Sequence, residues 1–235
     1  MIKFHRSALV RTLVPTLLLC VAVSNAPNAA AQAISQSAAQ KHLARIDFAI
    51  SGAGELTNTV SGVEQRDANS THSTLAIKPS STVGELVTLR YTAKPYVGFE
   101  FNFGNARFTQ NYTFTPPPSA NLLAGGAQAG ARELTFGYVA HPQYRPLGLQ
   151  PFLGLGGGTI RFTPTTYGGQ GLPQQYRAAY YYTIGVEDNF PGSHFGVRVG
   201  FRQLIYIAPD FLQNYLTITR RTRTSEPNIG FFVRF

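Results

Sequence analysis

The chain has 235 residues and is poor in cysteine, in tryptophan and in charge. It holds a single cysteine, Cys20, and no tryptophan, and 13% of its residues are charged, against about 25% in an ordinary soluble domain. Cys20 lies in a segment that we expect to be removed. For the mature chain this excludes a disulfide framework, a cysteine-ligated zinc site and a cysteine nucleophile. The low charge disfavours a protein whose whole outer face meets water.

Long apolar runs are also missing, with one exception near the N-terminus. The run Leu13–Val23 follows a basic segment and precedes small residues at A-x-A spacing in 29–33. This order is typical of a secretory signal peptide, here with cleavage after Ala33 or after Ala31. The run is too short for a membrane-spanning helix, which needs about 20 apolar residues.

The cysteine in this run leaves one alternative open, because lipid attachment in lipoproteins also follows an apolar segment. Leu19 precedes Cys20 where a small residue is expected, and this favours an ordinary signal peptide. We therefore predict a cleaved signal peptide at 1–33, a short periplasmic lead-in at 34–43 and one domain at 44–235.

The net charge indicates no nucleic-acid partner. The signal peptide takes three of the twenty basic residues and none of the eleven acidic ones, which leaves the mature chain with a net charge of +6. This excess is modest, and no dense Lys/Arg tract accompanies it.

Aromatic residues are abundant, with 12 Tyr and 17 Phe, and they recur in alternation. The clearest case is 97–104, where Val and Phe alternate with Gly, Glu and Asn. A period of two predicts a β-strand with one apolar and one polar face. An aromatic-rich, charge-poor chain of such segments has the composition of strands that face lipid.

The same pattern predicts eight strands, separated by connections that alternate in length. The predicted strands are 44–50, 83–93, 97–114, 132–141, 151–163, 176–190, 195–207 and 216–235. Tight turns are expected at 94–95, 142–150 and 191–193, and longer loops at 57–82, 116–130, 164–175 and 208–214. Short turns on one side and long loops on the other are typical of a bacterial outer-membrane barrel.

The last eight residues, 228–235, carry a resemblance to a known family. Ile229, Phe231, Val233 and Phe235 share one face of a strand that stops on an aromatic residue. This ending resembles the closing strand of bacterial outer-membrane β-barrels, and the whole pattern is similar to the OmpA/OmpX-like group of small barrels. The resemblance implies an all-β fold, a closed antiparallel up-and-down transmembrane β-barrel of eight strands, located in the outer membrane.

The resemblance also implies partners. In the family the closing strand is a signal for the barrel-assembly machinery, which here maps onto Phe231, Val233 and Phe235. It further implies contact with outer-membrane lipid and lipopolysaccharide, and a monomeric barrel. The sequence indicates no surface partner.

Alternation alone does not say which face points outward, and a lipocalin-like soluble barrel has the same period with the faces reversed. The predicted polar face carries both signs of charge in similar numbers, which suits pairing inside a narrow lumen better than a soluble coat. We therefore expect a lumen charge network, formed by Arg45, Asp47, Arg90, Glu100, Glu133, Arg177, Glu187, Arg198 and Arg202.

Three functions follow from such a barrel. An eight-stranded barrel is just wide enough for side chains to fill it, so the first is a closed barrel with a structural or surface-interacting role through its long loops. The second is a narrow ion-conducting channel lined by Arg90, Arg198 and Arg202. The third is an enzyme that modifies lipid A.

No catalytic residue, metal ligand or cofactor site is predicted. The four mature histidines are scattered without metal-ligand spacing, and the glycine-rich run 154–159 lacks the lysine of a phosphate-binding loop. We therefore expect no enzyme, no cofactor and no metal.

One site hypothesis concerns the start of the last strand. In the register set by Phe235, Arg221 and Arg223 face outward at the extracellular end, where they could contact lipopolysaccharide phosphates. The alternative is a solvated strand end without a ligand.

Overall fold

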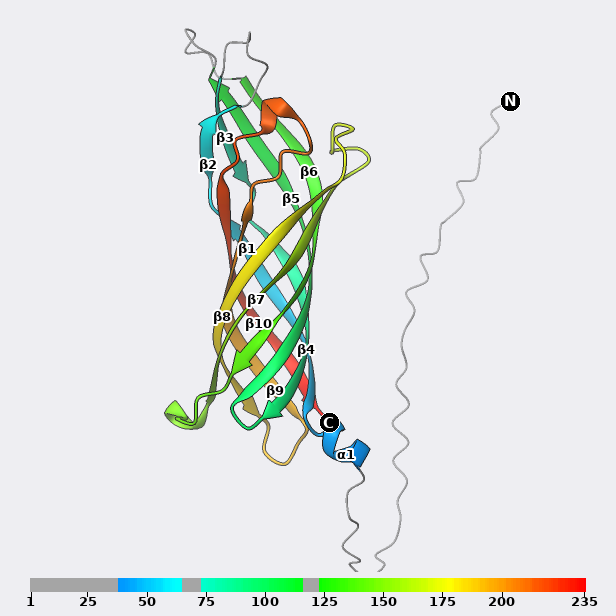
Figure 1. The fold of residues 1–235 in the computed structure, drawn as a ribbon, viewed down its shortest axis with the longest axis vertical. Helices are drawn as coiled ribbons and strands as arrows, with labels where there is room; N and C mark the ends of the chain where they lie inside the picture. The colour runs from blue at the N-terminus through cyan, green and yellow to red at the C-terminus, as the bar shows by residue number, and fades with distance from the viewer. Residues whose placement is uncertain (1–37, 65–72, 116–122) are drawn as a thin grey trace, which may run out of the picture. The chain divides into compact units, whose positions relative to one another are not determined.

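The computed structural model describes residues 38–64, 73–115 and 123–235 (Figure 1). The predicted signal peptide, Cys20 and residues 34–37 of the predicted lead-in lie outside the described residues. The rest of the lead-in is a six-residue helix, α1 (Ala38–Leu43). No helix among the described residues is long and apolar enough to cross a membrane.

Eight antiparallel strands form a closed barrel. They are β1 (Ile46–Thr57), β4 (Thr82–Lys94), β5 (Val97–Thr115), β6 (Leu123–Ala140), β7 (Gln150–Pro164), β8 (Gln175–Asn189), β9 (Phe195–Ile207) and β10 (Arg221–Arg234). Each pairs with the next of these strands in the chain, and β1 pairs with β10, so the ring has no free edge. The predicted all-β, eight-stranded up-and-down barrel is confirmed.

Two further strands lie outside the ring of eight. β2 (Val60–Val63) and β3 (Thr74–Pro79) form a hairpin, and β3 pairs with the far end of β5 from Thr74↔Thr115 to Pro79↔Gln110. The prediction of one loop over 57–82 is therefore wrong. β3 buries Leu75 and Ile77 completely, which gives this short segment enough apolar contact to pair.

The predicted loop over 116–130 is also wrong in its second half, because β6 begins at Leu123. After Leu123 the strand continues with Gly and Ala over 124–127, which show no apolar alternation. Gly125 pairs with Tyr112 of β5, and a Cβ at Gly125 would lie 2.3 Å from the Tyr112 ring. Small residues are needed here so that the large rings of β5 have room.

The last strand begins later than predicted. β10 starts at Arg221, and the preceding segment 208–220 is a connection that contains the 3-10 helix η2 (Asn214–Leu216). Phe211 and Leu216 in this connection are fully buried. The segment therefore packs inward instead of continuing the wall, and we refer to 208–220 as the plug segment.

The two ends of the barrel differ. At the end that holds α1 and the C-terminus, the connections are short, at 95–96, 141–149 with the 3-10 helix η1 (Pro146–Gly148), and 190–194 (Figure 1). The other end holds the β2–β3 hairpin and the plug segment. We call these the termini end and the loop end.

The two faces of the wall also differ, as the alternation predicts. The outer face exposes large apolar side chains on all eight strands, among them Ile50, Leu89, Phe101, Phe136, Leu155, Tyr180, Phe201 and Phe231. The inner face buries the charged and polar ones. The barrel is thus apolar outside and polar inside, the reverse of a soluble protein.

Candidate functional site: the charged lumen and its two mouths

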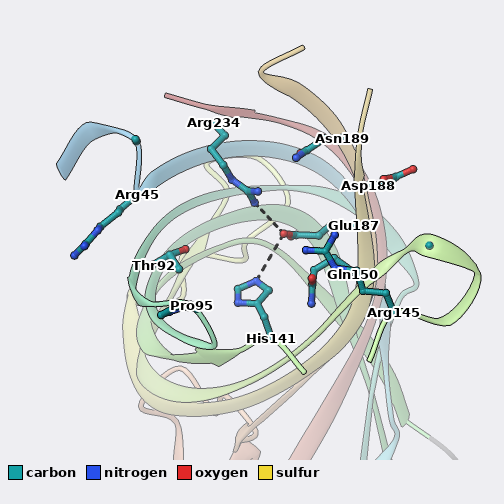
Figure 2. Close-up of a pocket in the computed structure, with 12 residues that line it drawn as sticks. Arg45, Thr92, Pro95, His141, Arg145, Gln150, Glu187, Asp188, Asn189 and Arg234 are labelled. Carbon is teal, nitrogen blue, oxygen red and sulfur yellow. Dashed lines mark hydrogen bonds and ion pairs between the residues drawn. The ribbon is translucent and has the colours of Figure 1, made fainter. Parts of the chain in front are cut away.

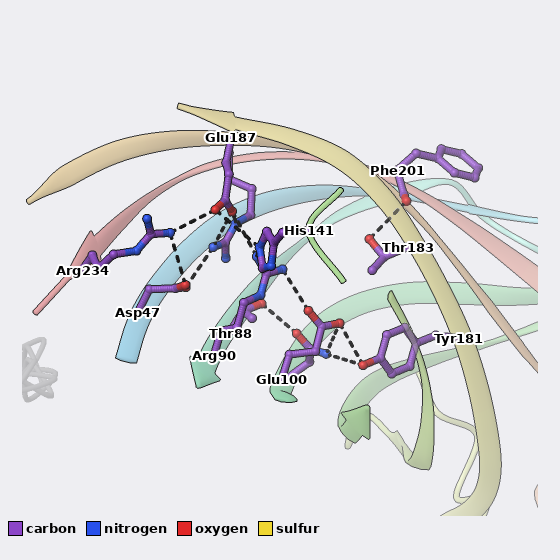
Figure 3. Close-up of polar contacts among 12 residues, drawn as sticks. Asp47, Thr88, Arg90, Glu100, His141, Tyr181, Thr183, Glu187, Phe201 and Arg234 are labelled. Atoms are coloured by element: carbon purple, nitrogen blue, oxygen red, sulfur yellow. Dashed lines mark hydrogen bonds and ion pairs between the residues drawn. The ribbon is translucent and has the colours of Figure 1, made fainter. Parts of the chain in front are cut away.

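A network of ion pairs fills the half of the lumen nearest the termini end, with Glu187 of β8 at its centre (Figure 3). Its carboxylate accepts hydrogen bonds from Arg90 Nη1 at 3.0 Å, Arg198 Nε at 2.9 Å and Arg234 Nη2 at 3.0 Å. These arginines come from β4, β9 and β10, so one carboxylate on β8 links its neighbour β9, the next strand β10, and β4 beyond β1.

The network extends from Glu187 in two directions. Arg90 donates a second hydrogen bond to Glu100 at 2.9 Å, and the same carboxylate accepts one from the Tyr181 hydroxyl at 2.9 Å. Arg198 donates to Asp47 at 2.9 Å. Arg90 and Asp47 are 1% exposed, and a charge so deeply buried is stable only when it is paired.

A second cluster lies further toward the loop end, around Arg202 of β9. Arg202 forms an ion pair with Glu133 and donates to Glu226 at 2.8 Å and to Thr135 at 3.0 Å. Its guanidinium carbon also lies 4.4 Å from the centre of the Tyr181 ring. Tyr181 therefore contacts both clusters and joins them into one column of side chains.

Aromatic rings on the inner face of the wall pack against the arginines. The Phe152 ring centre lies 4.8 Å from the Arg90 guanidinium carbon, and the Phe232 ring centre lies 5.0 Å from that of Arg198. These cation–π contacts fix the planes of the guanidinium groups. Seven of the nine residues of the predicted lumen charge network lie in these two clusters: Asp47, Arg90, Glu100, Glu133, Glu187, Arg198 and Arg202.

Two predicted members lie elsewhere. Arg45 precedes β1, is exposed at the termini end, and donates a hydrogen bond to the Ala93 carbonyl at 3.4 Å. Its assignment to the lumen was wrong because the alternation does not mark where the wall starts. Arg177 does point inward, but at the loop end, where it pairs with Asp210 of the plug segment at 2.9 Å.

Sequence reasoning missed several members of the network. Glu226 lies on β10 next to Pro227, in a polar stretch without apolar alternation. Arg234 alternates with Val233 and Phe235 and so belongs to the polar face of the last strand, but it is absent from the predicted network. Tyr181 is also absent, because an aromatic residue gives no sign in sequence that its hydroxyl binds a carboxylate.

The network opens at the termini end into a cavity of about 290 Å3 (Figure 2). Glu187, Arg234 and His141 line its inner side, and His141 Nε2 lies 3.7 Å from the Glu187 carboxylate. Arg45 and Arg145 line its rim. Water and small ions at this mouth therefore reach the base of the network.

The loop end of the lumen is apolar instead. Phe211, Leu216 and Ile218 of the plug segment are buried in one cluster with Leu75 and Ile77 of β3 and with Tyr112, Phe162, Leu204 and Tyr206 of the barrel strands. Gln110 of β5 donates to the Pro209 carbonyl at 2.7 Å, and Tyr215 packs on Phe114 at the tip of the same strand. The plug segment leaves β9 and reaches β5 across the mouth (Figure 1).

Polar contacts anchor the plug segment on β8 as well. Asp210 accepts hydrogen bonds from Gln175 at 2.5 Å and Thr217 at 2.9 Å, besides its ion pair with Arg177. Burial raises the pKa of the Asp210 carboxyl, but the bonds from Gln175, the Leu212 N–H and Thr217, together with Arg177, outweigh it. The pKa of Asp210 therefore lies below its ordinary value.

A small cavity lies inside the wall beside the Arg202 cluster. It measures about 20 Å3 and is lined among others by Phe108, Tyr206 and Glu226. This is room for about one water molecule.

The remaining predicted site residues lie on the outer face of β10. Phe231 and Phe235 are 68% and 53% exposed, and the exposed Arg221 and Arg223 lie toward the loop end. Val233 pairs with Phe48 of β1 and Phe195 of β9. Among the described residues, no group of three or more His, Cys, Asp or Glu could hold a metal ion.

No protein-family model and no curated protein matches the chain. Three solved structures are similar at low sequence identity. Neisserial surface protein A has a TM-score of 0.47 at 12% identity, over 80% of this chain and 97% of that one. Ail, the attachment invasion locus protein of Yersinia pestis, solved with the heparin analogue sucrose octasulfate, has a TM-score of 0.42 at 14% identity, over 81% and 99%. The outer membrane protein AlkL, solved in lipid bilayers, has a TM-score of 0.38 at 14% identity, over 90% and 96%.

Proposed function

We propose that this chain is an integral outer-membrane β-barrel with a closed lumen, which acts through its loop end as a structural or surface-interacting protein. The observation that carries the proposal is the inversion of the wall. Large apolar side chains are exposed around the whole ring, while Asp47, Arg90, Glu100 and Arg202 are at most 2% exposed inside it. A closed barrel satisfies every backbone hydrogen bond internally, as lipid requires.

The orientation follows from the lengths of the connections. Outer-membrane barrels have short turns on the periplasmic side and longer loops outside the cell. We therefore place the termini end in the periplasm and the loop end outside. The β2–β3 hairpin and the plug segment then form the surface that meets the environment.

The closed lumen separates this proposal from a channel. Ions that enter the cavity at the termini end meet Glu187 with its three arginines, then the Arg202 cluster, and then the apolar plug. Breaking these pairs to pass an ion would leave buried charges without partners, which is costly.

Single-channel recording on the barrel in planar bilayers tests this point. We expect no discrete conductance steps for the wild type, and steps in a triple variant that opens all three barriers, Glu187→Ala with Arg202→Ala and Leu216→Gly. Steady ion-selective conductance of the wild type would support the narrow channel instead. A change in lipid A mass on overexpression would support the lipid A-modifying enzyme, which is the third candidate.

Two partners belong to the proposal. The outward Phe231 and Phe235, with Val233, would present the closing strand to the barrel-assembly machinery. Phe235→Ala should lower the fraction of chain that reaches the folded state in cells, while Leu147→Ala in the exposed turn at the same end should not.

Arg221 and Arg223 would contact lipopolysaccharide, and unchanged co-purification of lipopolysaccharide with Arg221→Ala/Arg223→Ala would contradict that contact.

A further inference from the structure

Three arginines lie together on the outer face at the loop end: Arg107 on β5, Arg132 on β6 and Arg161 on β7. Their chain neighbours Ala106, Glu133 and Ile160 are buried in the lumen. Because side chains alternate between the two faces of a strand, the three arginines point outward.

The apolar residues on the same strands show where the three arginines lie along the barrel axis. Along the outer face of β6, Tyr138, Phe136 and Leu134 are 56%, 52% and 46% exposed, and the next outward residue toward the loop end is Arg132. On β5 the outward series Phe101 and Phe103 passes through Asn105 to Arg107. The arginines therefore start where the apolar outer face stops.

These cations are brought together without an ion-pair partner among the described residues. Arg132 and Arg161 lie directly opposite each other in the β6–β7 register, and like charges in that position are destabilising. None of the three forms an ion pair within the described part of the chain. Glu85 lies in the same groove, but it accepts a hydrogen bond from Asn105 at 2.9 Å, while Arg107 donates to Gln128 at 2.7 Å.

The arginines line a groove of about 810 Å3. The connection after β7 forms one side of it and adds the hydroxyl groups of Thr166 and Tyr167, while the Thr165 hydroxyl donates to Gln128 at 3.2 Å. Arginine side chains and hydroxyl groups are donors that suit phosphate oxygens, and arginine can bind them in a bidentate manner. A groove of this size accommodates a headgroup with its first sugar or glycerol unit.

We propose that this groove binds the phosphate groups of a phosphorylated lipid of the outer leaflet. The proposal rests on the proposed function, because the membrane position of the barrel puts lipid headgroups at this height. The groove is separate from Arg221 and Arg223, since β10 and β6 lie on opposite sides of the ring. A bound phosphate would neutralise the repulsion between Arg132 and Arg161.

Binding to bisphosphorylated lipid A in mixed detergent micelles tests the proposal. The triple variant Arg107→Gln/Arg132→Gln/Arg161→Gln should bind roughly tenfold or more weakly than the wild type. The corresponding lysine variant keeps the charge but loses bidentate geometry, and it should bind with intermediate affinity. The matched control, Arg45→Gln/Lys94→Gln/Arg145→Gln, removes the same charge at the termini end and should bind as the wild type does.

The remaining arms identify the source of the phosphate and the cause of a failure. Dephosphorylated lipid A should bind the wild type as weakly as it binds the triple glutamine variant. Competition by millimolar inorganic phosphate would overturn the lipid assignment in favour of a free-phosphate site. If the triple glutamine variant and the control variant lost equal affinity for lipid A, binding would depend on the net charge of the protein and not on the groove, which would overturn the proposal. Each variant is first checked for a heat-modifiable folded band, so that failure of the barrel itself is distinguished from failure of this site.

Discussion

At the scale of single residues, Glu187 is the side chain on which the lumen depends most. It accepts hydrogen bonds from three arginines of three different strands, and it is 3% exposed. Buried ion pairs contribute little net stability compared with an apolar core, but removal of one partner leaves the others charged and unpaired. Removing the Glu187 carboxylate should therefore destabilise the fold by much more than the net stability that its intact ion pairs contribute.

We predict that Glu187→Gln lowers the free energy of unfolding by about 3–5 kcal/mol, the range for breaking a buried pair. The control is Asp188→Asn, on the next residue of the same strand, whose exposed side chain has no ion pair within the described residues. Because the chain has no tryptophan, urea unfolding is followed by circular dichroism and by gel migration. Equal midpoints for the two variants would contradict the role of Glu187.

Asp210 provides a pH-dependent contact at the other mouth. Its pKa in the folded protein lies below the unfolded value of about 3.9. Its contribution to stability is therefore complete above the unfolded pKa and is lost as the pH falls through the lower, folded pKa. We predict that the difference in thermal midpoint between wild type and Asp210→Asn is largest near neutral pH and shrinks on acidification below about pH 4. A difference that stays constant down to pH 2 would show that the ionised carboxylate is not what anchors the plug segment.

At the scale of elements, the strands divide into those that sequence alternation predicts well and those that it does not. β9 was predicted over its full range, and the inward facing of Arg198 and Arg202 was correct, because both alternate with Val and Phe over 197–202. The start of β6 was not, because its Gly and Ala residues make room for rings of a neighbouring strand and carry no alternation of their own. Small residues at these positions are required by the large side chains of the neighbouring strand. The sequence alone does not identify which residues those are.

The charge network also contains residues whose position the sequence predicts and residues whose position or partner it does not. The facing of a residue within a strand follows from alternation, so the seven central charges could be placed in the lumen together. Arg45 was misplaced because the end of a strand has no sharp signal, and the partner of Arg177 was not foreseen because Asp210 lies in a connection. Pairs between distant segments depend on the tilt and register of the closed barrel, which local pattern does not contain.

The plug segment is held by buried apolar side chains, and this gives a prediction. Leu216→Ala removes a fully buried side chain from the cluster and should cost about 2–5 kcal/mol of the free energy that holds the segment in place. Protease cleavage within 208–220 of the folded barrel should then become faster. Leu212→Ala, at a side chain that is 69% exposed in the same segment, is the control. Similar cleavage rates for both variants would contradict an inward-packed plug.

At the scale of the whole molecule, apolar side chains cover the outside of the barrel and charged side chains fill its inside. The fold is therefore stable with lipid, and not water, around its outer face. In water the exposed ring of Phe, Tyr, Leu and Ile side chains would cause aggregation. Against lipid the same ring is favourable, and the paired charges inside never meet the hydrocarbon. The low charge content of the sequence and the buried network are two consequences of this one inversion.

Heat modifiability of the refolded chain tests that inversion most directly. The mature chain is refolded in detergent, and gel migration is compared with and without boiling, alongside fractionation of cells that express it. We predict a faster-migrating unboiled band, found in the outer-membrane fraction. A chain that stays soluble in the periplasm without detergent and shows no band shift would contradict the account.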